Sequence, residues 1–316
     1  MTERGKCSKI KYVCFFAIIA RVRLVMFRHI GTKYFFSSIL AVVLGLGLCC
    51  GGCSMGTSST TDKPQGTETK AKVPGVAIPR RSPDVKYSVP QGVSILMYHM
   101  IGDMKNNAAV MTKENLERQM KYLKDHDYHP ITIEELYGYV ANGDPLPDKP
   151  VCITFDDGYI DTYTIVYPMM KKYNFPWTLF LITDDVEKSY QRMTWDQLKE
   201  MAESGDVTIA NHTLSHPKLH NLKTREEKEN EIIGASKALK YRLGIDTAWL
   251  AYPYGDYDDE VIDICKKAGI KMAVTTDAGR VHVGSYPYEL KRVYIGNDIS
   301  MARFVERLNK DNYSPV

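Results

Sequence analysis

Two adjacent acids stand directly behind an apolar run in the middle of the chain. The run reads Val-Cys-Ile-Thr-Phe, and Asp156 and Asp157 follow it. Such a run is typical of a strand that is buried on both faces of a parallel sheet. Adjacent carboxylates repel each other, and burying one costs several kcal/mol unless it is paired or binds a metal. These two acids therefore need partners, and a metal ion is a partner that also does chemistry.

Two histidines four residues apart offer further ligands for such a metal. His212 and His216 follow a second apolar run, in Ile-Ala-Asn-His-Thr-Leu-Ser-His. Two imidazole nitrogens and one carboxylate oxygen leave a position open for water, as in hydrolytic metal sites. The second acid could then stay ionised and act as a base. Taken singly, each motif has a plain alternative, because histidine pairs also occur as surface or capping residues and Asp-Asp-Gly also forms turns.

The elements that carry these motifs alternate between strand and helix. Apolar runs predict strands over residues 92–100, 149–158, 176–183, 206–212, 247–255, 270–277 and 290–298, and a short strand at the start of 129–143, and helical periodicity separates them. Regular alternation favours one α/β domain with parallel strands. Seven or eight repeats favour a barrel over an open sheet. We therefore predict a distorted (β/α) barrel of about seven parallel strands in a single catalytic domain over 91–316.

A barrel would gather the polar residues that end these strands. His99 ends the first strand, the acid pair ends another, and Tyr254 and Gly255 follow a third. The carboxyl ends of the strands of a (β/α) barrel meet at one mouth, where the functional residues lie. The motifs should therefore lie close together in space although they are far apart in the sequence.

The N-terminal part of the chain reads as a targeting segment and a tether. In residues 1–53 positive residues precede an apolar run that ends in Cys-Cys-Gly-Gly-Cys, which is typical of a bacterial lipoprotein signal lipidated at Cys53. An uncleaved signal anchor is the alternative. Met26 would be a more usual start, which would make residues 1–25 a start-site artefact. Residues 54–90 are rich in Ser, Thr, Pro and Lys and predict a flexible linker. Both alternatives place the domain outside the cytoplasm, tethered to the outer face of the cell membrane.

The composition of the chain limits which partners the domain is expected to bind. The 316 residues carry a net charge of +3 without a basic cluster, which argues against nucleic acid. Only two of the seven cysteines, Cys152 and Cys265, lie beyond the signal, and both sit in apolar patterns. We expect them to be buried free thiols in a monomer.

Three motifs, taken together, resemble a known family. Thr-Phe-Asp-Asp-Gly, His-Thr-Leu-Ser-His and Ala-Tyr-Pro-Tyr-Gly, in this order, are similar to the NodB-homology polysaccharide deacetylases of carbohydrate esterase family 4. The likeness covers residues from about 91 to 313. Ser-Ile-Leu-Met-Tyr-His and Leu-Lys-Arg-Val-Tyr resemble the branch of poly-N-acetylglucosamine deacetylases. The resemblance implies that Asp157, His212 and His216 hold a divalent metal, for which Zn²⁺ is suited and Co²⁺, Ni²⁺ or Mn²⁺ compete.

The same resemblance implies a reaction and three further roles. An N-acetyl group of an extracellular or cell-wall N-acetylglucosamine polysaccharide would be hydrolysed to acetate and a free amine. Asp156 would be the general base, and the backbone N–H of Tyr254 would stabilise the oxyanion of the tetrahedral intermediate. His99 would protonate the leaving amine, which is a very poor leaving group without that proton.

The chain departs from the family pattern at two places. Many members carry an arginine that orients the base where this chain has Ala251. Arg292, at a later strand end, could supply that charge, and the alternative is a surface or structural arginine. The usual Leu-x-His motif of the acid is also absent. His99 is preferred as the acid over His282, the only histidine after the third motif.

Two other functions stay open at this stage. The loss of arginine at Ala251 motivates a catalytically weak glycan-binding lipoprotein. An O-acetyl esterase that acts on xylan would use the same site, because its tetrahedral intermediate is similar. The sequence does not choose among poly-N-acetylglucosamine, chitin oligomers, peptidoglycan and acetylxylan as the acetylated glycan.

Overall fold

A closed ring of seven parallel strands forms the centre of the described domain. The computed structural model describes residues 81–104, 107 and 109–313. β2 pairs with both β10 and β5, which closes the barrel. The barrel strands are β2 (Ser94–Tyr98), β5 (Pro150–Asp157), β6 (Trp177–Leu181), β7 (Val207–Asn211), β8 (Trp249–Ala251), β9 (Met272–Ala278) and β10 (Leu290–Tyr294). The predicted distorted (β/α) barrel is confirmed. An eighth strand, β3 (His129–Ile131), pairs with the first residues of β5.

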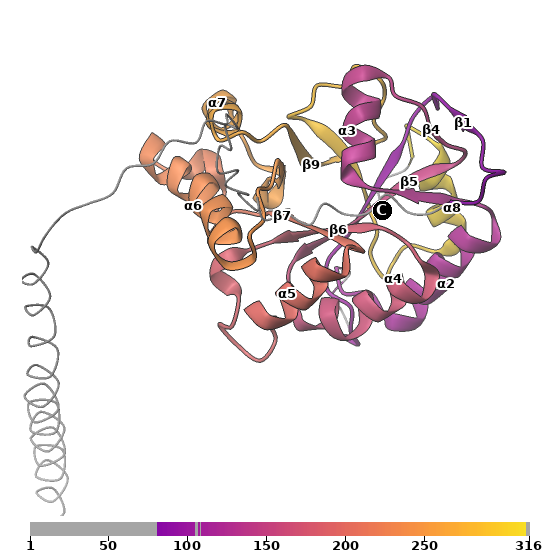
Figure 1. The fold of residues 1–316 in the computed structure, drawn as a ribbon, viewed down its shortest axis with the longest axis horizontal. Helices are drawn as coiled ribbons and strands as arrows, with labels where there is room; N and C mark the ends of the chain where they lie inside the picture. The colour runs from indigo at the N-terminus through magenta and orange to yellow at the C-terminus, as the bar shows by residue number, and fades with distance from the viewer. Residues whose placement is uncertain (1–80, 105–106, 108, 314–316) are drawn as a thin grey trace, which may run out of the picture. The chain divides into compact units, whose positions relative to one another are not determined.

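Helices follow the strands and lie around the barrel (Figure 1). They are α2 (Lys113–Asp125), α3 (Ile133–Asn142), α4 (Tyr167–Tyr173), α5 (Trp195–Ser204), α6 (Arg225–Leu243), α7 (Asp259–Lys267) and α8 (Met301–Asn309). Six of them begin behind a Thr, Asp or Ser side chain that accepts a backbone N–H of the first turn. Such caps satisfy N–H groups that the helix itself leaves unpaired. The helical segment between β5 and β6 begins with a π-helical turn, η1 (Thr162–Val166), and continues as α4.

The core explains why the barrel strands read as continuous apolar runs. Successive side chains on a strand point to opposite faces. Leu96 and Ile153 pack in one buried cluster, whereas their chain neighbours Ile95 and Cys152 pack in another. Both faces of the strands are therefore buried. The two cysteines are buried and free, as the sequence predicted.

The last part of the predicted linker contacts the folded domain. Arg81 donates to both carboxylate oxygens of Glu135 at the start of α3, at 2.6 and 2.9 Å. β1 (Tyr87–Ser88) pairs antiparallel with β4 (Leu146–Pro147) (Figure 1). The interpretation of residues 81–90 as flexible linker is corrected by these contacts, since a bidentate ion pair and a short backbone ladder hold them. The predicted signal over 1–53 lies outside the described residues.

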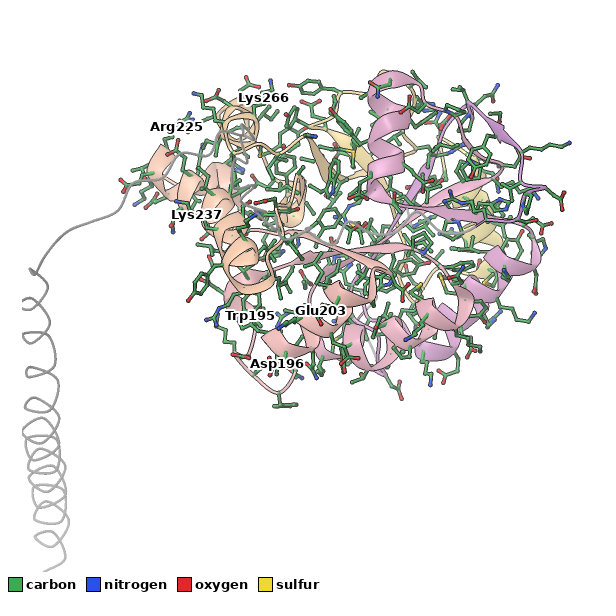
Figure 2. The ribbon with its side chains drawn as sticks, in the orientation of Figure 1. Trp195, Asp196, Glu203, Arg225, Lys237 and Lys266 are labelled. Atoms are coloured by element: carbon green, nitrogen blue, oxygen red, sulfur yellow. The ribbon has the colours of Figure 1, made fainter. Side chains whose placement is uncertain are left out.

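A charged network joins α6 to α7 on the outside of the barrel. Arg225, on α6, contacts Asp263 of α7 at 2.9 Å, and Lys228 contacts Asp258 at 2.6 Å. Arg225 and Lys266 lie on these two helices in Figure 2. Within the described part of the chain, no helix combines the length and the apolar character that crossing a bilayer requires.

Candidate active site

The carboxyl ends of the barrel strands surround an open cleft of about 750 Å³. Every residue that the sequence favoured for metal binding or catalysis lines this cleft: His99, Asp156, Asp157, His212, His216, Tyr254 and Arg292. Parallel strands that close into a barrel present their carboxyl ends at one mouth. The barrel therefore brings together residues that are up to 193 positions apart, from His99 to Arg292.

Three ligand atoms form a compact triangle at the bottom of the predicted metal site. Nε2 of His212 and Nε2 of His216 are 3.2 Å apart, and Oδ1 of Asp157 lies 3.5 and 3.6 Å from them. Ligands about 2.0–2.2 Å from a tetrahedral zinc ion are separated from one another by about 3.4 Å. The three distances fit one face of such a tetrahedron. Among the described residues, this is the one group of three His, Cys, Asp or Glu side chains that meets this condition.

Hydrogen bonds and turns fix the ligands. Nδ1 of His212 lies 2.8 Å from the carbonyl oxygen of Ala251, which it can donate to, so that Nε2 carries the lone pair. Asp157 and His216 both adopt left-handed backbone conformations, with φ of 74° and 64°. Thr213 accepts the N–H of His216 at 3.1 Å, so its hydroxyl closes the turn.

The charges around the triangle hold two of its three ligands in the form that binds a metal. Burial alone would raise the pKa of Asp157, but the neighbouring histidines hold it well below its usual range. Burial and the nearby His212 lower the pKa of His216 to about 4. Burial works against protonation of His212 as well, but the carboxylates of Asp157 and Asp156 outweigh it and raise its pKa. An ionised carboxylate and neutral imidazoles are the forms in which these side chains bind metals, so Asp157 and His216 are in the ligating form and His212 would give up a proton on binding.

The second acid has a different environment. Asp156 is 1% exposed and accepts two hydrogen bonds from Arg292, at 2.8 and 2.7 Å. Arg292 is equally buried, and its Nε donates to the carbonyl oxygen of Thr275 at 2.8 Å. Burial would raise the pKa of Asp156, but the guanidinium outweighs burial and lowers it. Arg292 thus lies where the sequence hypothesis placed a charge for the base, and it is not a surface residue.

An irregularity in the sheet helps to place Arg292. The register between β10 and β9 shifts between Leu290 and Arg292, which pair with Val274 and Ala278. A bulge of this kind bends a strand and changes the direction of its side chains, and bulges are common beside active sites. The carbonyl of Thr275, which holds Arg292, belongs to the bulged part of β9.

The two candidate acids lie at opposite ends of the barrel. Nε2 of His99 is 3.9 Å from Oδ2 of Asp156, at the carboxyl end of β2. His282 lies beside the start of β2, where its Nδ1 is 2.5 Å from the carbonyl oxygen of Gln91, and its Nε2 is 3.3 Å from Asp311. His282 does not line the cleft. The geometry therefore favours His99 as the acid.

A strained turn carries Tyr254. Its φ and ψ are 60° and 10°, in the left-handed region that a bulky residue rarely adopts. Its carbonyl oxygen accepts from the hydroxyl of Thr276 at 3.2 Å, and its ring packs 4.6 Å from that of His216. The next residue, Gly255, also has a positive φ, of 69°. Two successive left-handed residues bring this backbone against the end of β9.

Gly255→Ala should disturb this turn strongly. A Cβ at that position would lie 2.2 Å from Oγ1 and 2.7 Å from the backbone nitrogen of Thr276. We expect a loss of unfolding free energy of more than the roughly 1–2 kcal/mol of left-handed strain alone, together with reduced turnover. Chemical denaturation and turnover assays measure both quantities.

Gly244→Ala is the matched control. Gly244 has a similar φ of 74°, but a Cβ there would meet nothing within 4 Å. It should lose only the strain energy and keep its turnover. Equal losses of stability in the two variants would contradict the close approach of Gly255 to β9.

Sequence reasoning did not identify one wall of the cleft. Arg192 lines it, 4.2 Å above the ring of Tyr159, in an ion pair of 2.7 Å with Asp185. Its Nη1 also donates to the carbonyl oxygen of Asp157 at 3.4 Å. These residues follow β5 and β6, and only their position after predicted strand ends could have indicated them.

Comparison with known proteins agrees with the motifs. A family model described as polysaccharide deacetylase matches residues 143–273, a range that holds both acids, both histidines and Tyr254. The Bacillus subtilis (strain 168) protein YxkH, which carries the name of a polysaccharide deacetylase, is 30% identical over 277 residues, covering 86% of this chain and 97% of its own. A poly-beta-1,6-N-acetyl-D-glucosamine N-deacetylase of Staphylococcus aureus is 32% identical over 202 residues, covering 60% of this chain and 68% of its own.

Solved structures show the same likeness. The Streptococcus pyogenes deacetylase PplD, in complex with acetate, has a TM-score of 0.65 and 30% identity, covering 70% of this chain and 100% of its own. IcaB of Ammonifex degensii has a TM-score of 0.62 and 25% identity, covering 70% of this chain and 98% of its own. With a relative 30% identical along 97% of its length and the three motifs around one cleft, the chain belongs to the polysaccharide deacetylase family, the NodB-homology carbohydrate esterases of family 4.

Proposed function

We propose that the protein is a metal-dependent hydrolase that removes N-acetyl groups from an extracellular or cell-wall polysaccharide containing N-acetylglucosamine. One observation carries the proposal: the two adjacent acids have different partners. Asp157 shares a tetrahedral face with His212 and His216, whereas Asp156 is held by Arg292. A ligand and an ionised base thus lie side by side, which is the arrangement that hydrolysis of an unactivated amide needs.

Asp157, His212 and His216 would hold the metal, and Asp156 would serve as the base. When bound, the metal supplies a Lewis acid that polarises the acetyl carbonyl and makes the attacking water acidic. Asp156 stays ionised because Arg292 lowers its pKa, and it accepts the proton of the water. Arg292 also fixes the plane of the carboxylate through two parallel hydrogen bonds.

Tyr254 and His99 would act on the two ends of the bond that breaks. The backbone N–H of Tyr254 would donate to the developing oxyanion, and its strained turn would fix that N–H in advance. His99 would give a proton to the nitrogen of the leaving amine. Its Nε2 lies 3.9 Å from the carboxylate of Asp156, so one acetamido group can lie between the acid and the water that the base deprotonates.

The names of relatives support a poly-N-acetylglucosamine substrate within this proposal. The Staphylococcus aureus relative is named for poly-beta-1,6-N-acetyl-D-glucosamine. We also propose that the enzyme works outside the cytoplasm as a monomer, tethered to the outer face of the membrane through residues 1–53. That segment has the composition of a lipoprotein signal or a signal anchor.

Acetate release tests the proposed function. Oligomers of β-1,6-linked N-acetylglucosamine, chitin oligomers, peptidoglycan and acetylxylan are incubated with the protein loaded with Zn²⁺ or Co²⁺. We expect acetate and free amines from an N-acetylated glycan, and loss of the activity on treatment with a chelator. Asp156→Asn is the control for background hydrolysis.

Two results would contradict the proposal in different ways. Release from acetylxylan alone would identify an O-acetyl esterase. Binding of a glycan without release of acetate, with metal present, would identify a glycan-binding protein.

A further inference from the structure

The ring of His99 has few contacts that could fix it. Its Nδ1 is buried and has no hydrogen-bond partner among the described residues, and its Nε2 is 3.9 Å from the nearest carboxylate, that of Asp156. A proton donor must lie within about 2.6–3.2 Å of the atom that it protonates. The position of His99 therefore depends on the backbone on either side of it.

The residues before and after His99 are held firmly. Tyr98 is fully buried, and its hydroxyl donates to Gln119 at 2.7 Å. After His99, Met100 accepts from the backbone N–H of Met111 at 3.0 Å. The N–H of Ile101 has a side-chain partner instead of a backbone one, because it donates to Oδ1 of Asp161 at 2.7 Å. The backbone N–H two residues after His99 is thus bound by a carboxylate from the segment that follows β5.

Asp161 is an unusual acceptor for the N–H of Ile101. It is 5% exposed, and its Oδ2 is buried without a hydrogen-bond partner among the described residues. It directly precedes η1, but its side chain makes no capping hydrogen bond to that helix. Burial raises the pKa of Asp161 to about 6. A buried carboxylate with an unpaired oxygen lowers stability, and the usual capping role does not account for it.

We propose that Asp161 is a positioning residue that holds the His99 backbone at the cleft by binding the N–H of Ile101. Asp161 lies four residues after Asp157, in the segment that carries the metal ligand. Its carboxylate thus ties the loop of the acid to the strand end of the base and the ligand. The π-helical turn after Asp161 is a feature that recurs at functional sites. The inference rests on the proposed function, because it assigns the acid role to His99.

The test separates loss of the acid from loss of the whole site. Turnover is measured with an N-acetylglucosamine oligomer, whose amine must be protonated as it leaves, and with 4-nitrophenyl acetate, whose phenolate leaves without a proton. His99→Ala should lower the amide rate far more than the ester rate. Asp161→Ala should lower the amide kcat about tenfold to 100-fold, with a smaller loss on the ester and little change in KM.

Asp161→Asn distinguishes positioning from general disruption. Its side-chain oxygen can still accept the N–H of Ile101, so the ratio of ester to amide turnover should stay within about threefold of the wild type. Asp258→Ala is the matched control. Asp258 accepts the N–H of Val261 at 2.8 Å at the start of α7 and does not line the cleft. This variant should lose stability but keep the ratio.

Amide hydrogen exchange of residues 99–104 gives a second measurement that needs no turnover. Exchange at Ile101 should become faster in Asp161→Ala and not in Asp161→Asn. Equal loss of both activities in Asp161→Ala, an unchanged ratio, or unchanged exchange at Ile101 would overturn the inference. If the wild type releases no acetate from any amide, the proposed function fails, and the exchange measurement still decides whether Asp161 holds the loop.

Discussion

Replacing His212 with alanine should remove the metal and lower deacetylation about 1,000-fold or more. The described residues offer three ligands, and His212 contributes the most buried imidazole, at 2% exposure. The contact of 2.8 Å between its Nδ1 and the carbonyl oxygen of Ala251 holds the ring with Nε2 beside the other two ligands. Losing a Lewis acid removes several kcal/mol of transition-state stabilisation. Metal content of the purified protein and acetate release measure the two effects.

The control for this prediction is a histidine outside the cleft. His126 stacks on Tyr122 at the end of α2, 3.8 Å between ring centroids, and does not line the cleft. His126→Ala should keep one metal per chain and full turnover. A His212→Ala protein that retains stoichiometric metal and normal turnover would exclude the assigned ligand set.

The fold and the central part of the site could be predicted because they depend on local patterns. Apolar runs such as that before Asp156 appear wherever both faces of a strand are buried, and their alternation with helices limits the topology to few choices. The rule that parallel strands of a barrel meet at one mouth then brings His99, Asp156, His212 and Tyr254 together. The structure places all four around the cleft.

What the sequence left open depends on contacts that no local pattern encodes. Arg292 and Asp156 are 136 residues apart, and they meet because β2 joins β10 to β5 and because β9 bulges beside Arg292. The choice between His99 and His282 depended on which end of the barrel each occupies. The end of the linker was also misjudged, since only the folded partner Glu135 shows why Arg81 is held.

The buried pair of Arg292 and Asp156 should show the largest combined effect on stability and activity. Arg292→Met keeps much of the volume but leaves Asp156 buried without its partner. Breaking a buried ion pair in this way costs about 3–5 kcal/mol of unfolding free energy. Turnover at neutral pH should fall about 100-fold or more, because the base loses both its orientation and its ionised form.

The pKa of Asp156 determines whether the stability of Arg292→Met should rise or fall with pH. In the wild type the folded pKa of Asp156 is lowered, chiefly because the guanidinium outweighs burial. Without Arg292, burial dominates and the folded pKa lies above its unfolded value of about 3.9. The folded variant then binds more protons than the unfolded chain, so its stability falls as the pH rises from about 4 toward the raised pKa. The acidic limb of kcat/KM should move to higher pH as well.

Two further variants show whether the effect belongs to the base. Lys228→Met breaks an ion pair outside the cleft, in which a buried lysine of α6 contacts the partly exposed carboxylate of Asp258. It should lose stability and leave the acidic limb of kcat/KM where it is. Asp156→Asn combined with Arg292→Met removes both charges, and its stability should exceed that of Arg292→Met although it stays inactive. If Arg292→Met left the acidic limb unmoved, Arg292 would be a structural residue only, and the orientation and ionisation of Asp156 would need another source.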